Sequence, residues 1–337
     1  MLMVYIRISM LLILAFATPL HAREDDNIET PSAAVQALHG LQRLDQRLHR
    51  IGYRLLAENV SFCRDKIPNS GILLHDIQQY GDKTAARAAF GFSQDIAINS
   101  LVTGSAGEQA GLLINDGIIA INDSNVKQFS NNRSQSDEAE NNNLRISRFK
   151  TLLEQGAVQV VIMRNGQQQI LNLEPPLTCA SRFEIEPSKK RRASADGQVV
   201  KLTSTLAAYF QSDDEFAAVV AHEIAHNLLK HKDILNAQKV NRGFFGQFGK
   251  STKRIKETEI AADRLSVWLM VNAGYDPKAA IRFWTRYGKE HGKGIFSAST
   301  HYRWKKRVGL FEEEIAKINA MKISQGKRSP PLLHSQR

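Results

Sequence analysis

The segment His222-Glu223-Ile224-Ala225-His226 has the residue types and spacing that point most directly to chemistry in this 337-residue chain. Residues four apart lie on one face of a helix, so both imidazoles can reach the same ion. Neutral imidazole is a good ligand for Zn²⁺, with bonds of about 2.0–2.1 Å. Glu223 is offset by one residue, where its carboxylate can take a proton from a water molecule beside the metal. The motif therefore predicts a zinc-dependent hydrolase with Glu223 as its general base.

A catalytic zinc site needs a third protein ligand and one open coordination position. The best candidate for that ligand is Glu259, in a second predicted helix. Glu257 is turned by about 200° from Glu259 on this helix, so only one of the two glutamates can face the metal. Asp263 lies one turn beyond Glu259 and is expected to accept the other N–H of a histidine ligand. A surface acid in a helix salt bridge is the alternative for Asp263.

The helix that must position the two histidines is predicted from Glu215 to about Lys230. Ser212 is expected to be its N-cap, with Glu215 as the capping-box partner three residues on. His231 follows His226 by five residues, so it is expected to point to another part of the helix and not to bind the metal. Further helices are predicted over residues 253–273, from Pro277, and after His301.

These motifs together resemble the gluzincin metalloendopeptidases that include the CAAX prenyl protease, the heat-shock protease HtpX and their soluble periplasmic relatives. The resemblance covers roughly residues 185–320. It implies a mainly helical zincin domain over residues 185–325, one Zn²⁺ per chain, and hydrolysis of peptide bonds in polypeptide substrates. The matching pieces are Ala195-Asp196-Gly197, residues 215–226, His231, residues 259–263, and Ser299-Thr300-His301 with Arg307.

Peptide hydrolysis by such a site needs a second stabiliser of the oxyanion besides zinc, and His301 or Arg307 is expected to provide it. His301 can donate a hydrogen bond to the oxyanion, or it can occupy the open zinc position and exclude water. A capping or core histidine is the third alternative. Arg307 can also brace its segment or pair with a carboxylate near the metal.

The substrates suggested by the resemblance are misfolded or unassembled exported proteins of the cell envelope. One alternative is a non-catalytic chaperone or adaptor with a zinc-stabilised helical domain and a peptide groove. Another is a zinc hydrolase that acts on a bond other than the peptide bond, because the same chemistry would serve an ester or amide. Proteolysis that a chelator abolishes would distinguish the enzyme from the adaptor.

Residues 71–177 form a separate stretch in which short β-prone runs alternate with turn residues. Asn165-Gly166 between the last two runs is a strong hairpin signal. Residues 89–92 and 104–112 resemble a PDZ domain, which implies that Phe90, Gly91 and Phe92 form a loop that receives the C-terminal carboxylate of a peptide ligand. A structural domain that binds nothing is the alternative. Strands are predicted at residues 96–101, 117–121, 158–163 and 169–173, and a polar loop at residues 130–143.

Residues 1–22 have the pattern of an export signal, with Arg7 before an apolar run from Ile8 to Ala17. The expected location is the periplasm, with membrane association through a retained N-terminal anchor as the alternative. Export would expose the chain to oxidising conditions, so Cys63 and Cys179 are expected to form a disulfide. Two buried free thiols are the alternative.

The remaining features concern partners and overall class. A formal charge of +11 falls to +10 without Arg7, and favours peripheral contact with anionic membranes or acidic partners. No nucleic-acid partner is expected, because no reading motif is present. With 42% hydrophobic and 23% charged residues, the chain is expected to be globular.

The expected fold class is α+β: a mainly helical zincin domain with a small β-rich PDZ-like domain. An amphipathic helix is predicted at residues 31–62 and a polar tail at residues 326–337. Residues 243–249 carry a glycine at every third position and three phenylalanines. They are expected to form a mobile lid, with a loop tucked into the core as the alternative.

Overall fold

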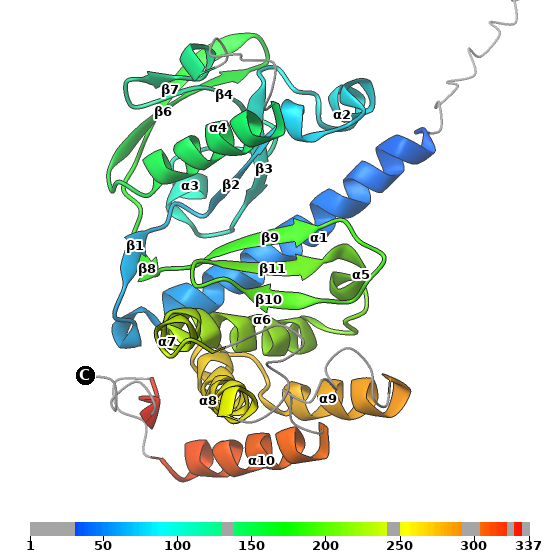
Figure 1. The fold of residues 1–337 in the computed structure, drawn as a ribbon. Helices are drawn as coiled ribbons and strands as arrows, with labels where there is room; N and C mark the ends of the chain where they lie inside the picture. Colours follow the sequence, from blue (N-terminus) through cyan, green and yellow to red (C-terminus); the bar gives the residue numbers. More distant parts are fainter. Residues whose placement is uncertain (1–30, 130–137, 241–249, 292–303, 322–326, 332–337) are drawn as a thin grey trace, which may run out of the picture. The chain divides into compact units, whose positions relative to one another are not determined.

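The computed structural model of this chain describes residues 31–129, 138–240, 250–291, 304–321 and 327–331 (Figure 1). The predicted export signal, the predicted lid at residues 243–249 and His301 lie outside these ranges. Helices occur together with β-sheets, so the predicted α+β class is confirmed. None of the helices in the described ranges combines the length and apolar content that crossing a bilayer requires.

Helix α1 (Ala33–Glu58) lies within the range predicted for an amphipathic helix. Its second half buries Leu48, Ile51 and Leu55, which recur at spacings of three and four and join the larger hydrophobic core. This face packs against helix α6 (Asp213–Leu228). The burial of one helix face explains why the apolar periodicity alone was enough to predict α1.

An antiparallel sheet follows α1. Its strand order is β2-β3-β4-β6-β7, and the short strand β5 pairs with β4. The hairpin predicted at Asn165-Gly166 is confirmed, because both residues have positive φ, 52° and 76°, as a two-residue turn of this kind requires. The strands are β2 (Ile72–Asp76), β3 (Ile96–Leu101), β4 (Gly117–Ile121), β5 (Ser124–Asn125), β6 (Val158–Arg164) and β7 (Gln167–Leu173), with helix α3 (Ala106–Gln109) between β3 and β4.

Two helices in this region were not predicted. Helix α4 (Glu138–Leu153) begins inside the polar loop predicted at residues 130–143, so that prediction is wrong from residue 138 onward. The reason is a buried stripe of Ile146, Phe149 and Leu153, which packs with the sheet core and stabilises a helix whose beginning is rich in asparagine. The other is α2 (Lys83–Phe90), whose N-cap Asp82 accepts a hydrogen bond from the Ala85 N–H.

Phe90, Gly91 and Phe92 have a packing role in this structure. Gly91 ends α2 with a φ of 57°, and its N–H already donates to the carbonyl of Arg87. The rings of Phe90 and Phe92 are buried against each other and against His75. These contacts do not support a loop that offers free N–H groups to a peptide carboxylate.

A disulfide joins Cys63, just after α1, to Cys179, so the predicted cross-link is confirmed. Both cysteines are buried and neither is free. Beside the bond, strand β1 (Lys66–Pro68) pairs antiparallel with β8 (Leu177–Cys179) in a short ribbon. The chain therefore enters and leaves the β-rich region at one place, which the disulfide closes.

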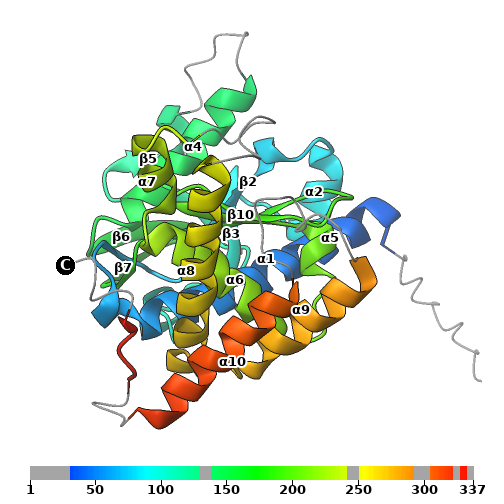
Figure 2. The ribbon, with the colours of Figure 1, turned by 60° about the horizontal axis from the view of Figure 1, so that its bottom comes forward.

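The last part of the chain combines a three-stranded sheet with helices. The strand order is β10-β11-β9, with β11 parallel to β9 and antiparallel to β10. Helix α10 packs against both α8 and α9, and each of these two helices also packs against α6 (Figure 2). The elements are β9 (Arg182–Glu186), β10 (Ala193–Ala195), β11 (Val199–Thr203), α5 (Ser204–Ala207), α6, α7 (His231–Ala237), α8 (Lys250–Asn272), α9 (Lys278–His291) and α10 (Trp304–Ala320).

Replacing both Cys63 and Cys179 by serine is expected to lower the free energy of unfolding by about 2–5 kcal/mol, because the bond joins residues 116 apart in the sequence. Urea unfolding of the oxidised wild type and the double variant, followed by circular dichroism, measures the difference. Reduced wild type is the control and should match the variant. An unchanged free energy of unfolding would show that the cross-link does not stabilise the fold.

Asp45 on α1 predicts a pH dependence of stability. Its carboxylate accepts a hydrogen bond from Asn99 Nδ2 at 3.1 Å, and burial raises its pKa from 3.8 to about 6. The contribution of this group to stability is therefore full below its unfolded pKa and is lost as the pH rises through about 6. Asp45→Asn should raise the free energy of unfolding by about 2–3 kcal/mol near pH 8 and leave it unchanged near pH 3.5. Urea unfolding at both pH values tests this, and an equal effect at both would contradict it.

Candidate metal centre

Helix α6 carries both histidines of the motif. Its N-cap is Ser212 as predicted, whose Oγ accepts a hydrogen bond from the Glu215 N–H at 3.2 Å. The Glu215 carboxylate instead accepts a hydrogen bond from the Gln211 N–H, so the structure does not show the predicted capping box. The small apolar run from Ala217 to Ala221 is buried, so this helix lies in the core rather than on the surface. The motif is therefore presented by a rigid element that is fixed on several sides.

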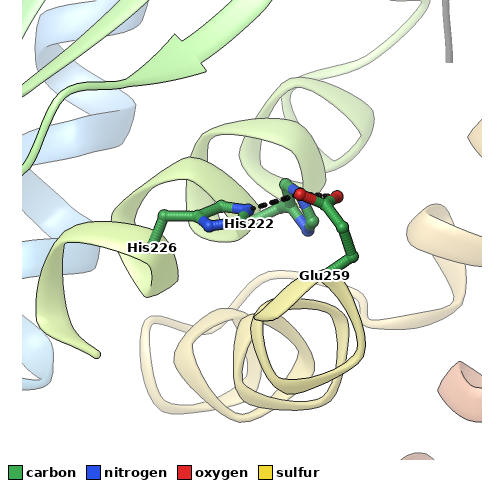
Figure 3. A group of neighbouring side chains, drawn as sticks. All are labelled: His222, His226 and Glu259. Atoms are coloured by element: carbon green, nitrogen blue, oxygen red, sulfur yellow. Dashed lines mark hydrogen bonds and ion pairs between the residues drawn. The ribbon is translucent and has the colours of Figure 1, made fainter. Parts of the chain in front are cut away.

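Helix α8 packs against α6 and brings Glu259 to the two histidines (Figure 3). The Nε2 atoms of His222 and His226 are 3.1 Å apart. The Glu259 carboxylate lies 3.5 Å from His222 Nε2 through one oxygen and 3.5 Å from His226 Nε2 through the other. One possible ligand atom from each of the three residues lies within 4.8 Å of the others. The structure thus brings together the three residues that the sequence predicted as ligands.

These distances fit the geometry of zinc. With bonds of about 2.0–2.1 Å, the ligand atoms of a tetrahedral site lie about 3.3–3.4 Å apart. The distance of 3.1 Å between the two histidine nitrogens and the distances of 3.5 Å from each nitrogen to a Glu259 oxygen bracket that spacing. Two imidazoles and one carboxylate are also the donor set of catalytic zinc sites, which keep the fourth position for water or substrate. Helix geometry allowed only one of Glu257 and Glu259 to face the metal, and Glu257 is exposed.

Asp263 and Arg307 lie on the other side of the His222 ring. Asp263 Oδ1 is 2.9 Å from His222 Nδ1, and Arg307 of α10 donates to the same carboxylate oxygen. The Arg307 guanidinium also lies 3.6 Å from the centre of the Trp284 ring, a cation–π contact. Asp263 is 1% exposed and Arg307 is 3% exposed, so this ion pair is shielded from water. Arg307 therefore contacts the back of a candidate ligand rather than the space in front of it.

The two histidines differ in their electrostatics. Burial lowers the pKa of His226 to about 3. Burial also acts to lower the pKa of His222, but the hydrogen bonds to Asp263 and Glu259 outweigh it and raise that pKa to about 9. A histidine must be neutral to bind a metal, so metal binding would release a proton from His222.

His231 was predicted to point away from the metal site, and the structure contradicts this. Its Nδ1 lies 2.9 Å from Nδ1 of His226. The prediction failed because α6 ends at Leu228, and Lys230 then adopts a left-handed conformation with φ of 55° that turns the chain back. This turn has no clear sequence signal, because a glycine or asparagine would normally mark it and Lys230 stands there instead.

A cleft of about 380 Å³ opens onto the three candidate ligands and onto Glu223. One wall is strand β10 with Gly197, whose N–H donates to Asn227 Oδ1 at 2.8 Å. Asn227 also donates to Ser181 Oγ, so one buried side chain of α6 fixes the turn between β10 and β11. A larger hollow of about 1090 Å³ lies beside α1, but none of the candidate metal ligands in the described part of the chain lines it.

Comparison with known proteins agrees with this chemistry. Residues 183–251 match the model of Peptidase family M48. The chain is 31% identical over 124 residues to the mitochondrial metalloendopeptidase OMA1 of Schizosaccharomyces pombe, covering 31% of this chain and 37% of that protein. It is 30% identical over 142 residues to the mitochondrial metalloendopeptidase OMA1 of Arabidopsis thaliana, covering 37% of this chain and 28% of that protein. The chain thus spans about a third of the length of these relatives, and both relatives are metalloendopeptidases by name.

The predicted periplasmic location is contradicted by these relatives, since both are named as mitochondrial proteins. The prediction depended on the apolar run after Arg7, which lies outside the described residues. A short apolar segment with one basic residue is a targeting pattern, and on its own it was not enough to identify the compartment.

Asp263→Asn is expected to weaken zinc binding by about 10–100-fold, because His222 loses the charged partner that orients it. The metal-free protein should also lose about 3–5 kcal/mol of stability, because Arg307 would be left buried without a countercharge. Competition with a chromogenic chelator and urea unfolding measure the two effects. Glu257→Gln, which alters an exposed glutamate of the same helix, is the control. Wild-type zinc affinity in Asp263→Asn would contradict the assignment.

Proposed function

We propose that this chain is a zinc-dependent endopeptidase in which His222, His226 and Glu259 hold the metal and Glu223 is the general base. The observation that carries the proposal is the convergence of two imidazoles and a carboxylate at tetrahedral spacing in a cleft that Glu223 also lines. The M48 match and the two metalloendopeptidase relatives support the same reaction. They do not favour the alternative of a non-catalytic chaperone or adaptor.

When bound, Zn²⁺ would supply a Lewis acid that lowers the pKa of water from about 15.7 to about 7 and polarises the scissile carbonyl. Glu223 follows His222 directly on α6 and lines the same cleft. In the proposed reaction it takes the proton of the attacking water and passes it to the leaving amine. Glu223 is buried, which suits this role because a carboxylate shielded from bulk water exchanges protons with the group in front of it.

Strand β10 is the element on which an extended substrate would bind. It stands at the end of the order β10-β11-β9, and β11 is its partner on one side. Among the residues that the structure describes, no strand pairs with its opposite edge, so that edge can offer backbone N–H and C=O groups to a peptide that adds as a further strand. Ala193, Ser194 and Ala195 of this strand line the cleft beside the candidate ligands. A peptide held there would have its backbone next to Glu223.

The class of substrate follows from this mode of binding. A strand can add to β10 only from a segment that is not already paired within a folded protein. Misfolded or unassembled polypeptides offer such segments, so we propose them as the substrates. The resemblance to the CAAX prenyl protease and HtpX peptidases suggests the same class of substrates. We propose that this chain is a peptidase of that subtype.

Arg307 is proposed to act through Asp263 rather than on the substrate. Its contacts with Asp263, His222 and Trp284 all lie behind the His222 ring, which supports a role in holding that ring. His301 remains our candidate for the oxyanion donor. The β-rich region of residues 71–177 is proposed to be an accessory domain, without the peptide loop predicted at Phe90 to Phe92.

Glu223→Gln is expected to keep the zinc content of the wild type and to lower casein hydrolysis by about 10²–10⁴-fold, because glutamine cannot accept the proton. Metal analysis of the purified proteins and release of labelled peptides from casein measure the two quantities. Glu257→Gln should retain both zinc and activity. Full activity in Glu223→Gln would refute the role of Glu223, and a wild type that binds no zinc would refute the metal site.

A further inference from the structure

The two candidate histidine ligands are oriented by chemically different neighbours. Nδ1 of His222 faces the Asp263 carboxylate at 2.9 Å, whereas Nδ1 of His226 faces Nδ1 of His231 at 2.9 Å. The His226 and His231 rings meet edge to face, with centres 4.9 Å apart and planes at 76°. His231 is 5% exposed, so the contact between the two imidazoles is protected from competition by water.

The backbone is strained at the point that places His231. On an uninterrupted helix His231 would be turned by about 140° from His226 and would not meet it. The chain instead leaves α6 and starts α7 through Lys230, which has φ of 55°. A residue other than glycine costs on the order of 1–3 kcal/mol in this conformation. The Lys230 side chain pairs with Asp65, which holds the turn from outside.

The positions of the protons follow from the two contacts of His226. A neutral imidazole carries one proton, and a metal bound at Nε2 requires that proton to be on Nδ1. Nε2 of His226 is the atom that faces His222 and Glu259. The Nδ1–H must therefore donate to Nδ1 of His231, which accepts and carries its own proton on Nε2.

We propose that His231 is a positioning residue that fixes the ring orientation and tautomer of the metal ligand His226. It does for His226 what Asp263 does for His222, but without adding a negative charge. His231 is not itself a ligand, because its Nδ1 is used by His226 and it does not belong to the group of three converging residues. This inference depends on the zinc site of the proposed function.

The test compares zinc affinities of full-length wild type, His231→Leu and His231→Asn by chelator competition. Leucine has a similar size but no acceptor, whereas the asparagine Oδ1 lies near the position of the histidine Nδ1 and can accept the same hydrogen bond. His231→Leu should bind zinc about 10–100-fold more weakly, and His231→Asn should stay within about threefold of wild type. Casein hydrolysis by His231→Leu should recover when zinc is in excess.

Three controls separate positioning from a general effect on folding. His39→Leu, near the start of helix α1 and not among the residues that line the metal cleft, should leave zinc affinity unchanged. Urea unfolding of the metal-free proteins should give similar free energies for the leucine and asparagine variants. If His231→Leu does not fold, His231→Ala takes its place in the comparison. Nitrogen-15 NMR of histidine-labelled, zinc-loaded wild type should show His226 protonated at Nδ1 and His231 at Nε2.

Two results would overturn the inference: unchanged zinc affinity in His231→Leu, or equal losses in the leucine and asparagine variants, which would mean that the packing of α7 matters and the acceptor does not. Failure of the wild type to bind zinc would instead overturn the proposed function. The two failures are distinguishable because the first concerns how the variants differ from the wild type, and the second concerns whether the wild type binds zinc at all.

Discussion

The packing of α6 against α8 is the interaction on which the rest of the site depends. Two histidines from one helix and a carboxylate from another can reach tetrahedral spacing only if the helices approach closely. Small residues such as Ala221 and Ala225 of α6 and Ala262 of α8 are fully buried in the shared core. The same contact that buries apolar surface therefore also sets the distances of 3.1 and 3.5 Å at the candidate metal centre.

Helix α10 supports this arrangement from behind. Glu314 accepts hydrogen bonds from Arg264 and Trp268 of α8, and Arg307 donates to Asp263 of the same helix. A buried ion pair gains little net stability, because the cost of removing both charges from water offsets their attraction. Its value here is geometric, since the pair fixes the carboxylate against the His222 ring.

The sequence was most informative where the spacing of residues along a single helix determines which side chains share a face. The spacing of His222 and His226, and the helix phase of Glu257 against Glu259, gave three converging residues without any knowledge of tertiary contacts. The spacing could not reveal His231, because the turn at Lys230 breaks the helix phase without a glycine to mark it. The beginning of α4 was not predicted because its own residues are polar. The buried apolar residues that stabilise this helix come later in its sequence. At Phe90 to Phe92, the peptide-binding loop stays a prediction from a local motif, and the structure shows that the two rings are packed and buried.

The ribbon of β1 and β8, closed by the bond between Cys63 and Cys179, has a consequence for the integrity of the chain. Every peptide bond between those cysteines belongs to a covalent ring. A single cut anywhere in that ring opens it but leaves both halves attached, so the protein keeps its mass until the disulfide is reduced. A cut on either side of the ring releases a fragment at once. A cleavage inside the β-rich region would therefore leave the helices that form the candidate metal centre covalently joined to helix α1.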